Sequence, residues 1–159
     1  MTPDIFLKLD GIKGESKDEK HKGSIAIESF QWGLAQHGTM GQGGGGGAGK
    51  VSFNDIAIQK FADSSTPALM QACAGGDHIK TGVLTVRKAG GKQEEYYKVS
   101  LTQILVSSIH NTGAHGGVPS ETVTLNFDEI KFDYKEQGGD GKLGGVVKFG
   151  WNLSQNKKV

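Results

Sequence analysis

Residues 121–135 read Glu121-Thr-Val-Thr-Leu-Asn-Phe-Asp-Glu-Ile-Lys-Phe-Asp-Tyr-Lys135, and this run indicates the fold more clearly than any other. Apolar residues alternate with polar ones, as in a β-strand that buries one face. The alternation from Val123 to Phe127 changes phase at Asp128 and Glu129 and resumes at Ile130. A change of phase predicts either a bulge that bends the strand or two half-strands that bury opposite faces.

Alternation with a period of two extends over most of the chain, in the runs Asp4–Leu9, Ser24–Leu34, Val51–Phe61, Thr81–Arg87, Glu94–His110, Glu121–Lys135 and Val146–Leu153. Two of these runs, 24–34 and 51–61, repeat the change of phase. Long strands with such changes suit a small barrel whose strands curve and also meet partner chains. Glycine-rich segments at 90–91, 113–117 and 138–145 would supply the turns. We therefore predict a mostly β protein, a compact antiparallel β-barrel formed by residues 1–159 as a single domain.

One segment has the pattern of a helix. Thr66 would be its N-cap, Pro67 would stand at the first helical position, and Gly75 with Gly76 would end it. Its apolar face would comprise Leu69, Met70 and Cys73. We expect a single short α-helix that plugs or covers the barrel.

The segment Gly43–Gly49 contains six glycines and one alanine, and Lys50 follows directly. The spacing of Gly44, Gly49 and Lys50 matches a phosphate-binding loop, which also needs a hydroxyl after the lysine and a helix that begins there. Val51 supplies no hydroxyl, and the alternation after it predicts a strand. The pattern therefore favours an extended, flexible loop between two strands. Ordering each of its residues would cost roughly 1 to 2 kcal/mol unless contacts hold the loop.

Charge and hydropathy exclude several kinds of partner. Eighteen basic and seventeen acidic residues leave a net charge of +1, and because they are scattered, neither nucleic acid nor a membrane surface is favoured. The mixed-charge run 13–22 predicts a solvated loop. No apolar run approaches the ~20 residues of a membrane span, and the N-terminal residues lack the features of a signal peptide. We expect a cytoplasmic protein, with any export following a route that uses no cleaved leader.

No pattern of catalytic or metal-binding residues stands out. Cys73 is the single cysteine, and no two of the five histidines are spaced four residues apart. The motifs Gly-x-Ser-x-Gly and His-Glu-x-x-His do not occur. The neighbouring carboxylates Glu94 with Glu95, and Asp128 with Glu129, would point to opposite faces of strands. We expect no enzyme activity, no metal and no cofactor.

Eight segments occur in an order that is recognisable: 6–8, 14–18 (Gly-Glu-Ser-Lys-Asp), 43–50, 65–73, 84–91 (Leu-Thr-Val-Arg-Lys-Ala-Gly-Gly), 105–108, 123–127 and 150–152 (Gly-Trp-Asn). Over nearly the whole chain they resemble the Hcp family, the haemolysin-coregulated proteins of the bacterial type VI secretion system. The resemblance implies a barrel similar to that of phage tail tube proteins, which assembles into hexameric rings. Rings of such proteins stack into the inner tube that a contractile sheath expels from the cell.

Further properties follow from the resemblance. Members of the Hcp family are also released into the medium and can carry and stabilise small effector proteins in the lumen of the ring. The implied partners are other copies of the chain, the sheath, the spike-tip proteins and the effectors. Some relatives carry a C-terminal toxin, whereas this chain ends at Val159, just after its expected last strand. It resembles the plain tube form, without an effector extension.

In the Hcp family the glycine-rich loop contacts neighbouring subunits. We therefore predict an assembly element that comprises Met40, Gly43, Gly44, Gly45, Gly46, Gly47, Ala48, Gly49 and Lys50, with an inert linker as the alternative. Alternation also suggests which residues face the lumen. If Phe30 and Trp32 fill the core, Ser29 and Gln31 point the opposite way, toward the lumen, the solvent or a neighbouring subunit.

The alternatives to a secretion tube subunit are a phage-type tail tube protein and a nucleotide-binding protein that uses the loop before Lys50.

Overall fold

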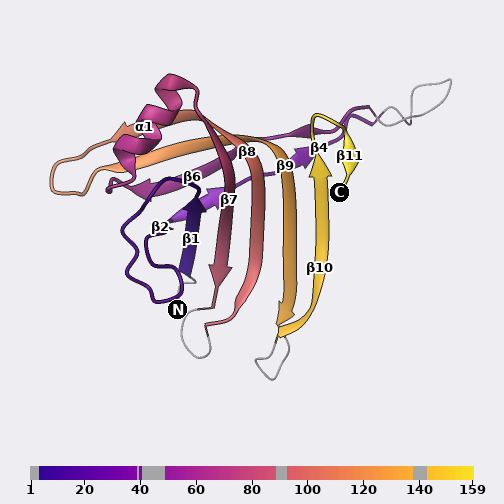
Figure 1. Ribbon diagram of the computed structural model, residues 1–159, viewed down its shortest axis with the longest axis horizontal. Helices are drawn as coiled ribbons and strands as arrows, with labels where there is room; N and C mark the ends of the chain where they lie inside the picture. The colour runs from indigo at the N-terminus through magenta and orange to yellow at the C-terminus, as the bar shows by residue number, and fades with distance from the viewer. Residues whose placement is uncertain (1–3, 39, 41–48, 89–92, 138–142) are drawn as a thin grey trace.

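The computed structural model describes residues 4–38, 40, 49–88, 93–137 and 143–159. Within these ranges the chain is mostly β, as predicted, and Figure 1 shows one short helix at one side of the strands. The elements in chain order are β1 (Asp4–Leu9), β2 (Ile25–Ala26), β3 (Ser29–Gln31), β4 (Leu34–Ala35), β5 (Ser52–Phe53), β6 (Ile56–Phe61), α1 (Thr66–Gly75), β7 (His78–Arg87), β8 (Glu95–Thr112), β9 (Ser120–Gln137), β10 (Leu143–Asn152) and β11 (Lys157–Lys158).

An antiparallel sheet in the order β2-β1-β7-β8-β9-β10-β11 forms the larger part of the molecule. The second half of β9 pairs with β10, whereas its first half pairs with β6, which in turn pairs with β3. The sheet therefore divides into two limbs that share β8 and β9. The large limb holds β1, β7, β10 and the hairpin residues 95–102 and 129–137; the small limb holds β3, β6 and residues 104–112 and 120–127.

The two limbs meet where β8 and β9 bend together. Figure 1 shows both strands curving from the large limb into the small one. Gln103 lies at the bend of β8 with a φ of 53°, opposite the change of phase in β9. Phe127 and Ile130, on either side of that change, belong to the same buried core. The change of phase is therefore a bend in the strand, which was the first of the two predicted alternatives. Both halves of β9 bury their apolar side chains in the same core.

The other two phase changes have a different origin. The runs 24–34 and 51–61, predicted as long strands, are each divided into short strands, β2 to β4 and β5 to β6. In these runs the change of phase falls at the break between two strands rather than at a bulge within one.

The sheet does not close into a complete barrel in the described part of the chain, which corrects the prediction in that respect. β2 ends the path beside β1, and β3 pairs with β6. Two backbone hydrogen bonds connect the limbs here, from Ile27 N to the Ile5 carbonyl (3.0 Å) and from Glu28 N to the Gln59 carbonyl (2.9 Å). The compact antiparallel arrangement is otherwise as expected.

The predicted helix is α1, which packs against β8. Its N-cap is Ser65 rather than Thr66, without a capping bond from the side chain, and its C-cap is Gly76 with a φ of 67°. The helix buries Leu69 and Ala72, whereas Met70 is exposed, so the predicted apolar face was wrong at that position.

One glycine in the core has a clear packing role. A Cβ at Gly82 would lie 2.7 Å from Leu9 Cδ2 and 2.8 Å from Ile104 Cδ1. The core is aliphatic apart from Phe127 and comprises Leu7, Leu9, Ile25, Ile27, Ile56, Ile58, Leu69, Ala72, Ile79, Leu84, Val86, Val99, Leu101, Ile104, Val106, Val123, Leu125, Phe127 and Ile130.

Candidate assembly surfaces

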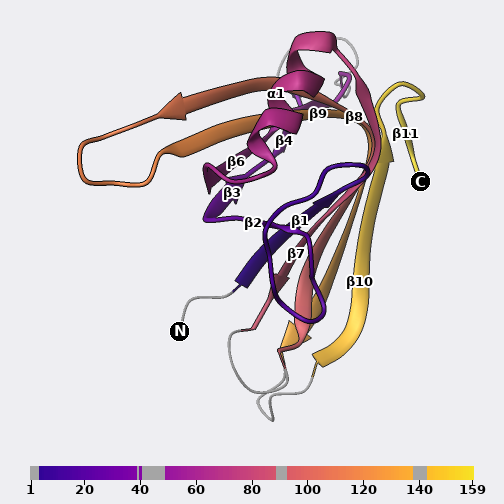
Figure 2. The same ribbon diagram turned by 60° about the vertical axis from the view of Figure 1, so that its left-hand side comes forward.

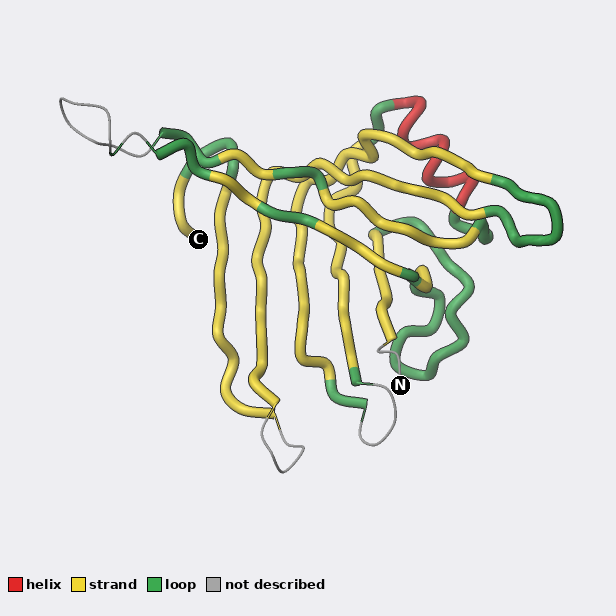
Figure 3. The backbone as a smooth tube through the Cα atoms, turned by 180° about the vertical axis from the view of Figure 1, so that it is seen from behind, coloured by secondary structure: helices red, strands yellow, loops and turns green. Residues whose placement is uncertain are grey.

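The β4–β5 hairpin forms an arm that continues the β3–β6 pair and extends beyond β10 (Figures 1 and 3). Of the predicted assembly element, residues 41–48, and with them Gly43 to Ala48, lie outside the described residues. Met40 is 82% exposed, and Gly49 and Lys50 are exposed. Leu34, on β4, is also exposed. The arm therefore presents apolar side chains that nothing in the described part of the chain covers.

The phosphate-binding interpretation of this loop is wrong. Val51 is followed by the strand β5, so no helix begins after Lys50. The backbone N–H groups that a helix start would offer to a phosphate are absent at that place. The loop connects two paired strands, β4 and β5, as the alternative predicted.

The small limb carries an outward face without fixed charges. Ser29 and Gln31 are exposed on β3, while Phe30 between them packs against the core, as the alternation predicted. Cross-strand neighbours share a face of a sheet. Two rows therefore lie on this face: Gln31, Ala57, Thr124 and Ser108, and Ser29, Gln59, Thr122 and His110. Neither row contains a lysine, arginine, aspartate or glutamate.

A hydrogen-bonded cluster borders the same face at a bulge of β8. The pairing of β8 with β9 shifts by one residue between Val106 and Ser108, which leaves Ser107 unpaired. Its hydroxyl contacts Asp55 Oδ2 (2.6 Å) and Thr124 Oγ1 (2.7 Å), and Asn126 Nδ2 donates to Asp55 Oδ1 (2.9 Å). Both oxygens of the Asp55 carboxylate thus accept hydrogen bonds.

Two strand edges of the small limb are unpaired within the described residues. β3 pairs with β6 along one edge, and β8 beyond Leu105 pairs with β9 alone. These edges lie at opposite sides of a four-stranded sheet in the order β3-β6-β9-β8. Unpaired backbone N–H and C=O groups at a sheet edge are sites for pairing with another chain.

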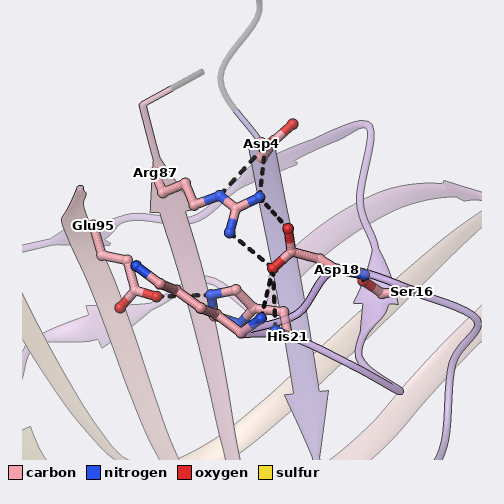
Figure 4. Close-up of polar contacts among 7 residues, drawn as sticks. Asp4, Ser16, Asp18, His21, Arg87 and Glu95 are labelled. Carbon is pink, nitrogen blue, oxygen red and sulfur yellow. Dashed lines mark hydrogen bonds and ion pairs between the residues drawn. The ribbon is translucent and has the colours of Figure 1, made fainter. Parts of the chain in front are cut away.

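Residues 13–24, called the strap here, lie over β1 and β7, as Figure 2 shows. Arg87 of β7, 2% exposed, holds the strap through Asp18 and holds β1 through Asp4 (Figure 4). Its Nη1 and Nη2 lie 2.8 and 2.5 Å from the two Asp18 oxygens, and Nη2 lies 3.0 Å from Asp4 Oδ2. The bidentate contact with Arg87 lowers the pKa of Asp18 to about 2, and the backbone N–H groups of Lys20 and His21 add to this effect.

A second contact fastens the strap to β8. His21 Nε2 lies 2.7 Å from Glu95 Oε1, and the imidazole stacks on Phe6 at 4.4 Å. Within the strap, a Cβ at Gly14 would lie 2.4 Å from the Ser24 carbonyl oxygen, so only glycine fits. The segment is a loop whose lysines and glutamates are exposed, as predicted, but it is also fastened to the sheet, which the prediction did not include. The segments 14–18 and 84–91, already singled out in the sequence, contain Asp18 and Arg87.

The other buried ion pair joins β6 to β9. Lys60 and Glu121 are paired in register, and Lys60 Nζ donates to Glu121 Oε2 at 2.7 Å, with both side chains almost fully buried. Lys60 also donates to Asp63 Oδ1 (3.0 Å), whose oxygen accepts from Ser65 N before α1. The sequence contained a signal for this pair, because Lys60 and Glu121 occupy positions that the alternation of their strands predicts to be buried.

Asp128 and Glu129 do not point to opposite faces, which corrects the prediction. Both approach the amide of Asn152, with Nδ2 at 3.5 Å from Asp128 Oδ2 and 3.4 Å from Glu129 Oε1. The reason is the bend of β9 at these residues, which interrupts the alternation. They hold the end of β10 rather than a substrate.

In the part of the chain that the structure describes, no three His, Cys, Asp or Glu side chains lie together in a way that could hold a metal ion. None of the described helices has the length and apolar character needed to cross a membrane.

The fold defines a mostly β protein with unpaired strand edges in the described part of the chain, and comparison with known proteins specifies the family. Residues 6–134 match the model of a family described as type VI secretion system effector, Hcp. The chain is 49% identical over 160 residues to Protein hcp1 of Pseudomonas aeruginosa strain PAO1, with 98% of each chain covered.

Two similar solved structures are a type six secretion system protein (TM-score 0.94, 33% identity, 99% of this chain and 100% of that one) and Hcp1 from Salmonella typhimurium (TM-score 0.83, 35% identity, 100% of each). The chain therefore belongs to the Hcp family. It is a tube subunit of the type VI secretion system, in a family of structural, secreted proteins.

Proposed function

We propose that this tube subunit assembles into homohexameric rings, that the rings stack, and that the uncharged face of the small limb lines the lumen and carries small effector proteins. The observation that carries the lumen assignment is the composition of the two rows through Gln31 and Ser29. A ring would repeat these residues around the channel. Such a wall offers hydrogen-bond donors and acceptors without fixed charges, which suits a carrier of varied cargo.

The two unpaired edges support closure of the ring. The edge of β3 and the edge of β8 beyond Leu105 lie at opposite sides of the small limb. If β3 of one copy pairs with β8 of the next, the contact joins two different surfaces, and such contacts generate rings when the rotation closes. The sheets of all copies would then continue around the lumen.

The arm supports contacts between copies in a second way. Met40 and Leu34 are exposed apolar residues, and burying an apolar side chain contributes roughly 1.5 to 3 kcal/mol. Contacts of this kind with a neighbouring subunit would offset part of the cost of ordering Met40 to Lys50. The inert linker is the alternative.

In this proposal the tube contacts the contractile sheath and ends at the spike-tip proteins. The subunit is made in the cytoplasm, leaves the cell without a cleaved leader, and inserts into no membrane. It binds no nucleic acid, needs no metal or cofactor and catalyses no reaction.

The test is native mass spectrometry of the purified protein, followed by electron microscopy of the same sample. We expect the mass of a hexamer and ring-shaped particles; a stable monomer at high concentration would contradict the ring. For the lumen, the substitution Gln31→Trp should reduce co-purification of effector proteins and leave the hexamer mass unchanged. Lys80→Trp, an exposed position on β7, is the control. Loss of rings, or unchanged effector retention, in Gln31→Trp would count against the lumen assignment.

A further inference from the structure

The outward face of the large limb has a composition opposite to that of the small limb. Strand register places two neighbouring rows on it: Phe6, Thr85, Lys98, Asp133 and Lys148, and Lys8, Val83, Ser100, Lys131 and Gly150. Phe6 and Thr85 are buried, and His21 of the strap stacks on Phe6, so the open part of the first row begins at Lys98. Strands in a sheet are about 4.8 Å apart, so Lys8 and Lys131, three strands apart, have backbones roughly 14 Å apart. The charges that are scattered along the sequence thus include four lysines brought onto one face.

Two hollows lie at this face, and each is lined by three lysines. The first, of about 500 Å³, lies between the end of β1 and the base of the strap, and its lining includes Lys8, Lys13 and Lys22. The second, of about 180 Å³, lies on β8, β9 and β10, and its lining includes Lys98, Lys135 and Lys148.

These lysines are free to meet a partner. Within the described residues, none of the six forms an ion pair within 4 Å. The first hollow contains one acidic residue, Asp10. The second contains Asp133 and Glu95, of which Glu95 already contacts His21. Positive charge therefore exceeds negative charge in both hollows.

Apolar groups stand beside the lysines. Ile12 belongs to the lining of the first hollow, and Tyr96 and Val146 to that of the second. Val146 is 43% exposed. A partner that fits both features carries carboxylates interspersed with apolar side chains, as an acidic segment of a protein does. A nucleic acid would match the charge but not the aliphatic groups.

We propose that the lysine-bearing face of the large limb, defined by Lys8, Lys13, Lys22, Lys98, Lys135 and Lys148, docks an acidic segment of another protein. The inference rests on the proposed function in one respect: if the subunits form a ring, neighbouring copies must leave this face accessible. The lumen would lie on the small limb, so cargo and the acidic partner would use different surfaces. Charge complementarity of this kind mainly affects the rate of association and the choice of partner.

The test measures binding of a fluorescent acidic peptide of repeated Glu-Glu-Leu units to the full chain at low and moderate salt. The triple variant Lys8→Gln, Lys98→Gln, Lys148→Gln should weaken binding about tenfold or more. The control variant Lys80→Gln, Lys157→Gln, Lys158→Gln makes the same change of charge at exposed lysines that line neither hollow. It should weaken binding less than about threefold, and the wild-type affinity should fall with added salt.

Three results would overturn the proposal: no binding by the wild type, equal losses in both variants, or tighter binding of single-stranded DNA of equal charge. Native mass spectrometry of each variant checks assembly separately. A wild-type protein that stays monomeric yet binds the peptide through these lysines would contradict the ring and support the face. Intact rings without selective binding of the peptide would support the ring and contradict the proposed docking face.

Discussion

At the scale of single residues, Arg87 joins three parts of the chain that are far apart in sequence. Its guanidinium contacts Asp4 in β1 and Asp18 in the strap, and it lies 4.9 Å from the centre of the Phe6 ring. Arginine suits this position because its planar group can bind one carboxylate with two nitrogens and contact a second. The strap stays on the sheet because of such contacts, since its own backbone bonds are mostly internal.

The Asp18 contact predicts a pH dependence. The folded pKa of about 2 lies below the ordinary value of 3.8, so the carboxylate adds stability above pH 3.8 that is lost as the pH falls toward 2. The difference in unfolding free energy between wild type and Asp18→Asn should be constant above about pH 5 and shrink below pH 4. Urea unfolding over this range measures it. Glu19→Gln, an exposed strap neighbour, is the control. A difference that does not change with pH would exclude the ionic contact as the cause.

At the scale of elements, the bend of β8 and β9 decides how the molecule is divided. In both strands the alternation changes phase at the same level, while the buried side chains on either side of the bend belong to one core. The register between the strands is the same on both sides of Gln103. Because of the bend, the same edge of β9 pairs with β6 along its first half and with β10 along its second half. The β8–β9 hairpin therefore belongs to both limbs, and its buried side chains form part of the core that the limbs share.

The bend predicts an unusual response to glycine. A left-handed backbone costs a residue with a Cβ roughly 1 kcal/mol that glycine does not bear. Gln103→Gly should therefore leave the unfolding free energy unchanged or raise it by up to about 1 kcal/mol, and Gln103→Val should lower it by about 1 kcal/mol or more. Gln59→Gly, at an exposed position of the regular strand β6, should lower it. Chemical denaturation compares the three. Destabilisation by Gln103→Gly as large as by Gln59→Gly would contradict the assigned strain.

At the scale of the whole molecule, the two limbs present faces of different chemistry. The two rows on the outward face of the small limb contain no fixed charge, with Asp55 at their border, whereas the large limb carries the lysines of the two hollows. The arm and the unpaired strand edges add surfaces that a monomer leaves exposed. Separate surfaces of this kind allow a subunit to contact neighbours, cargo and an outer partner at once.

The arm predicts an effect on assembly without an effect on folding. Leu34→Asp places a charge where an apolar side chain, 48% exposed in the monomer, would be buried between copies. Native mass spectrometry should detect a smaller hexamer fraction at a given concentration, whereas the circular dichroism spectrum should match that of the wild type. Met70→Asp, at an exposed position of α1, is the control. An unchanged hexamer fraction in Leu34→Asp would indicate that β4 lies outside the contact.

The sequence alone determined the features that depend on local periodicity. Alternation located β1 and the strands of the large hairpin, the proline and glycine pair located α1, and the phase change at Asp128 located the bend. Alternation also placed Ser29 and Gln31 on the outward side of β3. These features follow from which side chains a single segment must bury, so residues close in sequence contain the signal.

Only the tertiary structure decided the features that depend on distant segments. The contact of Arg87 with Asp18, the pairing of Lys60 with Glu121 and the gathering of lysines on the large limb join residues tens of positions apart. Periodicity does not fix the register between strands, because shifting one strand by two residues keeps the same face buried while changing every partner. The packing of the shared core selects the register of the strands. That register brings Arg87 next to Asp4 and under the strap, and it leaves the sheet open.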